Sequence, residues 1–179
     1  MRTGVTARQM LRTVVALAAL AAFTPAPSTE ATLMSNPITI TSTAFDEGGA
    51  IPSRYTCDGV EVSPPLAWSG PDGTAAFALI VSDPDAGGYI HWVVADIPGD
   101  RTSVAEDESP GQAGRNGFGR NDWGGPCPPS GTHRYSFEIF ALAEPLGLSP
   151  GFSADDLRAA IQGKVLASGR LAPTYRRGG

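Results

Sequence analysis

The stretch Phe77-Ala78-Leu79-Ile80-Val81 is an apolar run of strand length, and Ser82-Asp83-Pro84-Asp85-Ala86 follows it without a gap. Aspartate and proline are typical of turns, so the strand is expected to end close to Asp83. A second apolar run, residues 92–97, comes after a short connection. A connection of this length favours an antiparallel pair of strands over a crossover.

Two further segments show the pattern of a strand. Ile38-Thr39-Ile40-Thr41 alternates, and residues 135–142 alternate well, with aromatic and β-branched side chains. Residues 98–131 are rich in proline and glycine and predict loops. The chain of 179 residues holds 22 glycines and 16 prolines without a collagen-like period, which favours many turns between short strands.

One helix is expected late in the chain. Ser153 and Asp156 resemble a capping box, Leu157 and Ile161 supply an apolar stripe, and Gly163 is a natural stop. Extended structure is expected again from Val165 to Tyr175. We therefore predict a mostly β fold with one short C-terminal helix, in a single domain that spans residues 36–177.

Residues 1–31 have the pattern of a secretory signal peptide. Arginines precede a short apolar run at residues 14–23, and small residues and prolines follow it. The alternative is that translation starts at Met34. The first interpretation predicts export to the periplasm or the exterior, and the second predicts a cytoplasmic protein. No stretch reaches the roughly 18 apolar residues that a membrane-spanning helix needs.

Charge and cysteine content limit the classes of function. The net charge of -5 and the pI of about 4.9 argue against a nucleic-acid partner. In an exported protein, the pair Cys57 and Cys127 favours a disulfide slightly over two partly buried thiols. Two isolated cysteines and two isolated histidines lack the spacing of a zinc site, so we predict no metal and no cofactor.

Polar residues stand at the ends of three apolar stripes. Side chains alternate along a strand, so every second residue is expected on one face. The expected faces are Phe77, Leu79, Val81 and Asp83; His91, Val93, Ala95 and Ile97; and His133, Tyr135, Phe137, Ile139 and Ala141. If the strand after His133 also pairs antiparallel to residues 77–82, both histidines lie near Asp83 at one end of the sheet.

Such a cluster has more than one interpretation. Imidazolium groups beside glycine-rich loops can hold a phosphate or a carboxylate, and the same groups can act as acid and base. The alternative is that the histidines are structural residues at strand starts and that Asp83-Pro84-Asp85-Ala86 is turn chemistry alone. On these residues alone, the two interpretations have about equal weight.

The order of five segments resembles a known family. They are Tyr55-Thr56-Cys57-Asp58-Gly59, Ser63-Pro64-Pro65-Leu66-Ala67-Trp68, Asp83-Pro84-Asp85-Ala86, His91-Trp92-Val93 and Gly124-Gly125-Pro126-Cys127-Pro128-Pro129-Ser130-Gly131-Thr132-His133-Arg134-Tyr135. Together they resemble the phosphatidylethanolamine-binding proteins, in particular the bacterial branch called Raf-kinase-inhibitor-like. The resemblance runs from about residue 37 to residue 176.

The resemblance implies a sandwich of two antiparallel β-sheets with a C-terminal helix, and a small pocket for phosphate, phosphoryl head groups or similar anions. It is also compatible with a homodimer. Asp85 is expected to hold its turn, and Arg134 to pair with a carboxylate behind the pocket. The residues that the resemblance implies for the ligand site are Asp83, His91, His133, Tyr135, Gly131, Pro129 and Asp58.

Three functions are compatible with these observations. The leading hypothesis is a binding protein for a small anionic or phosphorylated ligand, without enzymatic activity. The second is an inhibitor that docks on a protein target, a protease or a kinase, through the rim of the pocket. The third is an enzyme that uses Asp83, His91 and His133 for proton transfer, although no nucleophile elbow or nucleotide loop supports it.

Overall fold

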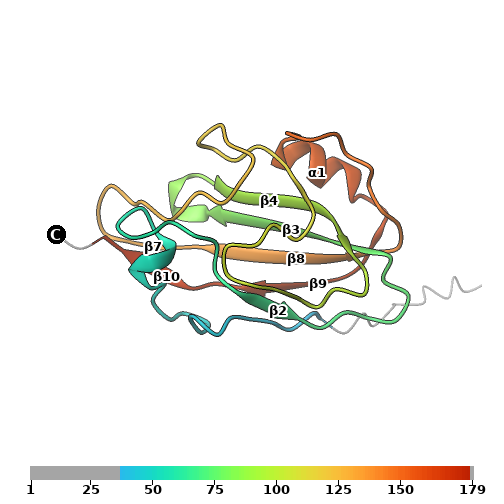
Figure 1. The fold of residues 1–179 in the computed structure, drawn as a ribbon, viewed down its shortest axis with the longest axis horizontal. Coiled ribbons are helices and arrows are strands. Elements are labelled where there is room, and N and C mark those ends of the chain that lie inside the picture. Colours follow the sequence, from blue (N-terminus) through green and yellow to red (C-terminus); the bar gives the residue numbers. More distant parts are fainter. Residues whose placement is uncertain (1–36, 178–179) are drawn as a thin grey trace, which may run out of the picture. The chain divides into compact units, whose positions relative to one another are not determined.

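The computed structural model describes residues 37–177 (Figure 1). The predicted signal peptide at residues 1–31 and the alternative start at Met34 lie outside the described residues. The first strand of the described part is β1 (Ile40–Thr41), and the last is β10 (Thr174–Arg176).

A five-stranded antiparallel sheet forms the centre of the fold, in the order β6-β4-β3-β8-β9 (Figure 1). All residues of β3 are buried, because the strand has a neighbour on each side and a layer of structure on each face. The predicted antiparallel pairing of this strand with the next one and with the strand after His133 is confirmed. The strands are β3 (Ala76–Asp83), β4 (Tyr89–Pro98), β6 (Gln112–Ala113), β8 (Ser136–Leu142) and β9 (Val165–Leu171).

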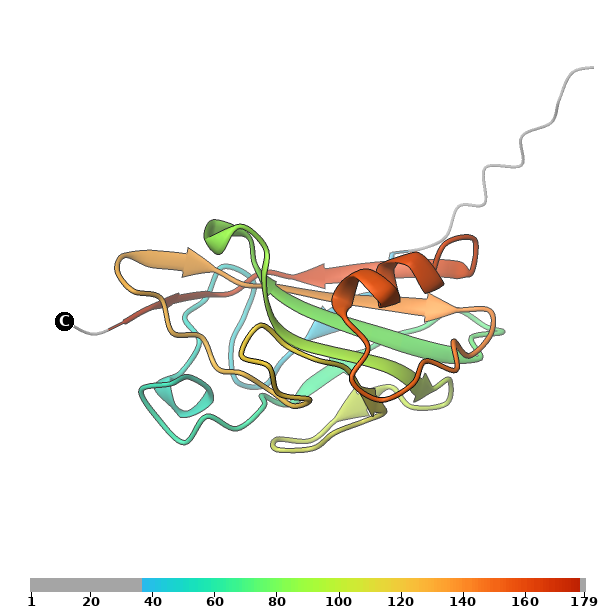
Figure 2. The same cartoon turned by 90° about the horizontal axis from the view of Figure 1, so that it is seen from above.

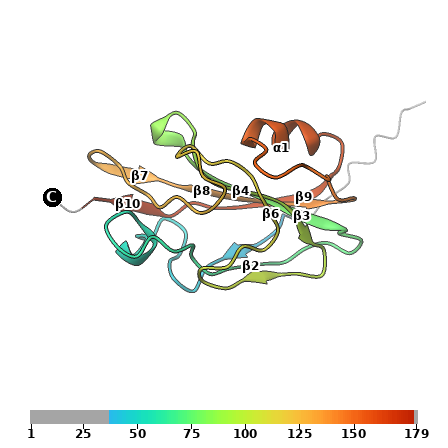
Figure 3. The same cartoon turned by 45° about the horizontal axis from the view of Figure 1, so that its top comes forward.

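Smaller elements cover the two faces of the central sheet. A three-stranded sheet contains β1, β2 (Leu66–Trp68) and β5 (Ser103–Val104), and β7 (Thr132–Arg134) pairs with β10. Figure 3 shows α1 (Ala154–Ala160) on one side of the central sheet and β2 on the other. The predicted fold class, mostly β with antiparallel sheets and one short helix, is confirmed, and the β7–β10 pair adds a third, two-stranded sheet.

Alternate residues of β3 enter two separate cores. Phe77, Leu79 and Val81 belong to the core between the central sheet and the three-stranded sheet. Ala78 and Ile80 belong to the core that also contains residues of α1. Full burial of a large apolar side chain contributes about 1.5–3 kcal/mol, so both faces of the strand stabilise the fold. The continuous apolar run therefore reflects a strand between two layers.

Two β-bulges change the expected face of β4. The pairing with β3 shifts once at His91 and again in the stretch just before Ile97, where Asp96 has a positive φ of 54°. Val93 and Ala95 consequently face the α1 side, whereas Ile97 lies in the core between the sheets. The predicted common face of His91, Val93, Ala95 and Ile97 is therefore wrong, because strict alternation does not hold across a bulge.

The helix begins where the sequence predicts. The Ser153 side chain accepts a hydrogen bond from the Asp156 backbone, and the Asp156 side chain accepts one from the Ser153 backbone, which completes the capping box. The helix ends at Ala160, and Gly163 follows with a φ of 75°. Among residues 37–177, no helix has the length and apolar character needed to cross a membrane.

Candidate functional site

A cavity of about 260 Å³ lies at the end of the central sheet that carries the β3–β4 turn. Three segments form its wall: this turn, the loop after β6, and β7. Figure 2 shows the short helical turn η2 (Pro84–Ala86, green) beside β7 (orange), and the two elements are in contact. The lining residues are Asp83, Ala86, Tyr89, His91, Phe118, Cys127, Pro128, Pro129 and His133.

A second hollow, of about 180 Å³, has the opposite chemistry. Its wall includes the carboxylates of Glu61, Asp107, Glu108 and Asp122, which repel an anion. Within the described residues, no group of three or more His, Cys, Asp or Glu side chains is arranged to hold a metal ion. The cavity that contains both histidines is therefore the candidate site.

Asp83 connects the β3–β4 turn to β7. The side chain is buried, and both of its oxygens are engaged: Oδ1 accepts from the Ala86 backbone N–H at 3.0 Å, and Oδ2 accepts from His133 Nδ1 at 2.7 Å. The first bond caps the turn, and the second fixes the orientation of the His133 ring. The ring nitrogen of His133 that stays available to a ligand is Nε2.

His91 is held by a different kind of partner. Its Nδ1–H donates to the backbone carbonyl of Gly124 at 2.7 Å, so Nε2 carries the free lone pair of the neutral ring. Burial lowers the pKa of His91, and the Gly124 carbonyl and the Asp83 carboxylate only partly oppose this effect. The ring is therefore neutral at neutral pH.

Tyr135 lies directly behind His91. The two rings meet edge to face with centroids 5.2 Å apart, and Tyr135 is completely buried. Its hydroxyl makes no hydrogen bond of regular geometry with any described residue. Burial, and then the negative charge of Asp83, raise the pKa of Tyr135 well above its ordinary value. The phenol therefore stays protonated at neutral pH.

Three of the predicted ligand residues, Tyr135, Gly131 and Asp58, lie outside the cavity lining. Gly131 forms the turn before β7 with a φ of 74°. Asp58 accepts hydrogen bonds from the Tyr175 hydroxyl at 2.7 Å and from Arg177 Nε at 3.0 Å. Tyr175 of β10 pairs with His133 of β7, so Asp58 anchors β10, the strand beside the site. Pro129, by contrast, is part of the cavity wall.

Asp85 and Arg134 form a clamp outside the cavity. Asp85 accepts from the Arg134 backbone N–H at 2.8 Å and from the guanidinium at 3.0 Å. The hydrogen bonds from Arg134 lower the pKa of Asp85 to about 2. The clamp ties η2 to β7 and so supports the contact between Asp83 and His133. The carboxylate expected behind the pocket is thus the second aspartate of the same Asp-Pro-Asp segment.

Two aromatic rings at the mouth of the cavity were missed by the sequence analysis. Tyr89 and Phe118 are both partly exposed, with ring centroids 5.1 Å apart, and each contacts the ring of His91. Gly124 makes room for Phe118, because a Cβ there would lie 2.4 Å from its ring. Tyr89 could have been found as the residue two positions before His91. Phe118 lies in a long loop without periodicity and carries no such signal.

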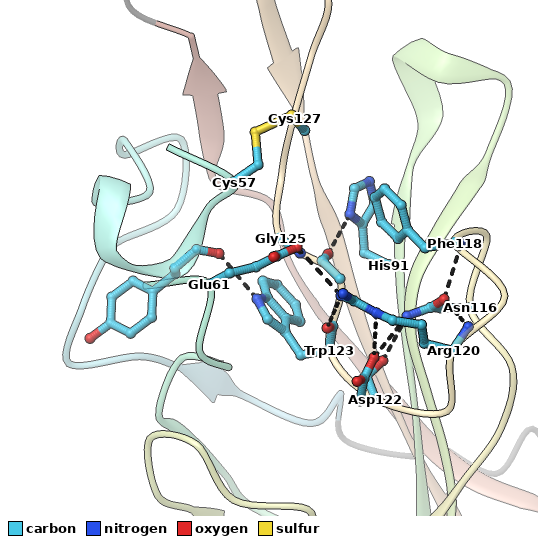
Figure 4. Close-up of polar contacts among 12 residues, drawn as sticks. Cys57, Glu61, His91, Asn116, Phe118, Arg120, Asp122, Trp123, Gly125 and Cys127 are labelled. Carbon is cyan, nitrogen blue, oxygen red and sulfur yellow. Dashed lines mark hydrogen bonds and ion pairs between the residues drawn. A yellow bond between two sulfur atoms is a disulfide. The ribbon is translucent and has the colours of Figure 1, made fainter. Parts of the chain in front are cut away.

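A disulfide anchors one wall of the cavity. Cys57 and Cys127 are bridged with a Cα–Cα distance of 5.4 Å, which is the quantity that the sequence alone could not provide (Figure 4). Cys127 is itself a lining residue, and Pro128 and Pro129 follow it along the wall. The bridge thus ties the loop that forms this wall to the segment around η1 (Ser53–Tyr55).

Comparison with known proteins agrees with this architecture. The family model of the phosphatidylethanolamine-binding proteins matches residues 41–176. The chain belongs to the phosphatidylethanolamine-binding protein family. This membership confirms the predicted family, and it supports a ligand-binding role for the chain.

Relatives from distant organisms share most of the described part. A UPF0098 protein of Methanothermobacter thermautotrophicus is 46% identical over 147 residues, which cover 75% of this chain and 96% of the relative. A Mycobacterium tuberculosis protein named "Putative lipoprotein LppC" is 41% identical over 160 residues, covering 86% of this chain and 77% of the relative. The crystal structure of CT736 from Chlamydia trachomatis has a TM-score of 0.77 at 35% identity, covering 80% of this chain and 99% of CT736.

Proposed function

We propose that the cavity binds phosphate, a phosphoryl head group or a similar small anion. One observation carries the proposal: both imidazoles line one cavity, and each has its Nδ1 already bound to an acceptor of the protein. The Nε2 atoms of His91 and His133 are therefore the polar atoms that these rings can offer to a ligand. Two oriented imidazoles in a small cavity suit a compact group with several oxygens.

The charges of the site support an anion rather than a cation. Both carboxylate oxygens of Asp83 are occupied by donors of the protein, so the carboxylate serves to orient His133. When protonated, His133 donates a charge-assisted hydrogen bond from Nε2, and its charge balances that of Asp83.

The apolar part of the wall favours an organic phosphate as a ligand, in addition to inorganic phosphate. Tyr89, Phe118, Pro128 and Pro129 give the mouth of the cavity an apolar surface. Such surfaces bind the non-reacting part of a small ligand, while a few polar groups fix its orientation. Family membership favours binding over catalysis, and we propose no reaction.

Titration with inorganic phosphate and with phosphoethanolamine, followed by NMR of the two imidazoles, tests the proposal. We expect the signals of both His91 and His133 to move with the same saturation curve. In His133→Gln, we expect the signals of His91 to stay in place. Arg158→Gln is the matched control, because this cation lies on α1 outside the cavity lining and pairs with Asp155. Imidazole signals that do not move at millimolar ligand would refute the proposal.

We also propose that the protein is exported, with residues 1–31 as a signal peptide ahead of the folded domain. The disulfide supports this proposal, because disulfides persist in oxidising compartments. N-terminal sequencing of the protein from its native host provides the test. We expect a chain that starts near Thr29 or Thr32, whereas a chain that starts at Met34 would contradict export.

A further inference from the structure

An ion pair on the surface lies behind the loop that holds His91. Arg120 Nη2 contacts Glu61 Oε1 at 3.4 Å, and Arg120 Nε also donates to Asp122 at 3.0 Å (Figure 4). The two partners come from distant parts of the sequence, because Glu61 follows the Cys57 loop and Arg120 lies in the loop after β6. The side chains are 45% and 33% exposed, so their direct attraction contributes little to stability. Their importance therefore depends on the backbone groups to which they form hydrogen bonds.

The ion pair holds two successive peptide groups on either side of Gly124. The carbonyl of Trp123 accepts from Arg120 at 2.9 Å, and the N–H of the same peptide group, on Gly124, donates to the His91 carbonyl at 2.9 Å. In the next peptide group, the N–H of Gly125 donates to Glu61 at 3.1 Å, and the Gly124 carbonyl accepts from His91 Nδ1. Each peptide group thus connects the ion pair to His91.

This arrangement strengthens the bond that orients the imidazole. A carboxylate that accepts from a peptide N–H polarises the peptide, so its carbonyl becomes a better acceptor. The Glu61 carboxylate acts in this way on the carbonyl that receives Nδ1–H of His91. Figure 4 shows the second ring nitrogen of His91 pointing away from this loop. With Nδ1 protonated, that nitrogen is a hydrogen-bond acceptor.

We propose that Arg120 and Glu61 are positioning residues that keep His91 in the Nδ1-protonated tautomer, and thereby make the cavity select oxyanions that carry a proton. The proposal rests on the proposed function, that is, on anion binding between His91 and His133. An acceptor at His91 Nε2 satisfies the P–O–H group of hydrogen phosphate, or of a phosphate monoester in its monoanionic form. Sulfate has no proton to donate at neutral pH and leaves this acceptor without a partner, which is costly in a buried site.

The first experiment determines the tautomer of His91 in the full-length protein by ¹⁵N NMR of the imidazole at neutral pH. We expect Nδ1 to carry the proton, and a ring with the proton on Nε2 would overturn the proposal before any variant is made. Titration with inorganic phosphate and with sulfate then measures the selectivity. We expect phosphate to bind at least about fivefold more tightly, which corresponds to the lower limit of about 1 kcal/mol for an unpaired buried acceptor. Equal affinities would overturn it.

The second experiment compares Glu61→Ala with Glu106→Ala. Glu106 is a matched control, because it also pairs with an exposed arginine, Arg54, and its hydrogen bonds go to Arg54 and Tyr55 instead of the peptide groups on either side of Gly124. We expect Glu61→Ala to shift the His91 nitrogens toward a mixture of tautomers and to reduce the preference for phosphate about threefold to tenfold, the range of one hydrogen bond. Glu61→Gln, which keeps an acceptor for Gly125, should restore most of the preference.

The outcomes separate this proposal from the proposed function. If phosphate does not move the signals of His91 and His133 in the wild-type protein, anion binding fails, and the inference about selectivity fails with it. If the wild type binds phosphate and Glu61→Ala behaves like Glu106→Ala, only the positioning role is overturned. Should Glu61→Ala not fold, Arg120→Gln takes its place, with a shift of the His91 nitrogens expected and unchanged nitrogens refuting the role.

Discussion

Reduction of the Cys57–Cys127 disulfide is expected to remove a large part of the stability of the domain. The bridge joins residues 70 positions apart, and in the chain-entropy account a loop of this length contributes about 4.4 kcal/mol at 25 °C. Domains have a total free energy of unfolding of about 5–15 kcal/mol. The reduced protein should therefore stay folded only by a small margin.

Urea denaturation with and without reductant measures this contribution. For a denaturant dependence of about 2 kcal/mol per molar, a loss of about 4.4 kcal/mol lowers the midpoint by about 2 M. The double variant Cys57→Ser/Cys127→Ser should unfold at the same midpoint as the reduced wild type, and reductant should not affect it further. A change below about 1 kcal/mol would show that the neighbouring contacts hold the loops without the bridge, and it would refute the reasoning.

Three further predictions follow from particular side chains. Burial lowers the pKa of His91 in the folded protein, so the unfolded chain binds this proton more readily. The free energy of unfolding should therefore decrease as the pH drops below about 6.5, and urea titrations of His91→Gln should show a weaker dependence on pH. Leu157→Ala should cost about 2–5 kcal/mol of unfolding free energy, because Leu157 is completely buried, while phosphate titration of the histidines stays unchanged. Arg134→Gln should raise the pKa of Asp85 from about 2 toward its ordinary value, measured by ¹³C NMR of the carboxylate.

Much of the architecture could be predicted from local patterns. The apolar run before Asp83 and the alternation after His133 predict the two central strands, and the capping box at Ser153 predicts the start of the helix. The same patterns bring Asp83, His91 and His133 to one end of the sheet, and all three line the cavity. These features are predictable because each depends on the residues of a single segment, or on one short connection.

Features that depend on contacts between distant segments could not be predicted in the same way. The bulge at His91 lets this side chain face the cavity although the residues after it change face. A prediction from strict alternation cannot detect such a bulge. Asp58 stands in a motif that resembles the pocket border, yet its partners are Tyr175 and an arginine near the end of the described part. Phe118 reaches the cavity because backbone N–H groups of its loop donate hydrogen bonds to carbonyls of β4.

The two histidines of the site illustrate how a second contact decides what a side chain can do. Both rings use Nδ1 to bind the protein, but the partner of His133 is a carboxylate and the partner of His91 is a peptide carbonyl. Burial against the carbonyl keeps His91 neutral, so its Nε2 accepts, whereas Nε2 of His133 donates when that ring is protonated. A cavity with one donor and one acceptor fits a ligand that offers both, and a hydrogen phosphate group does so with two of its oxygens. The partner at Nδ1, rather than the imidazole itself, thus decides what each Nε2 offers to a ligand.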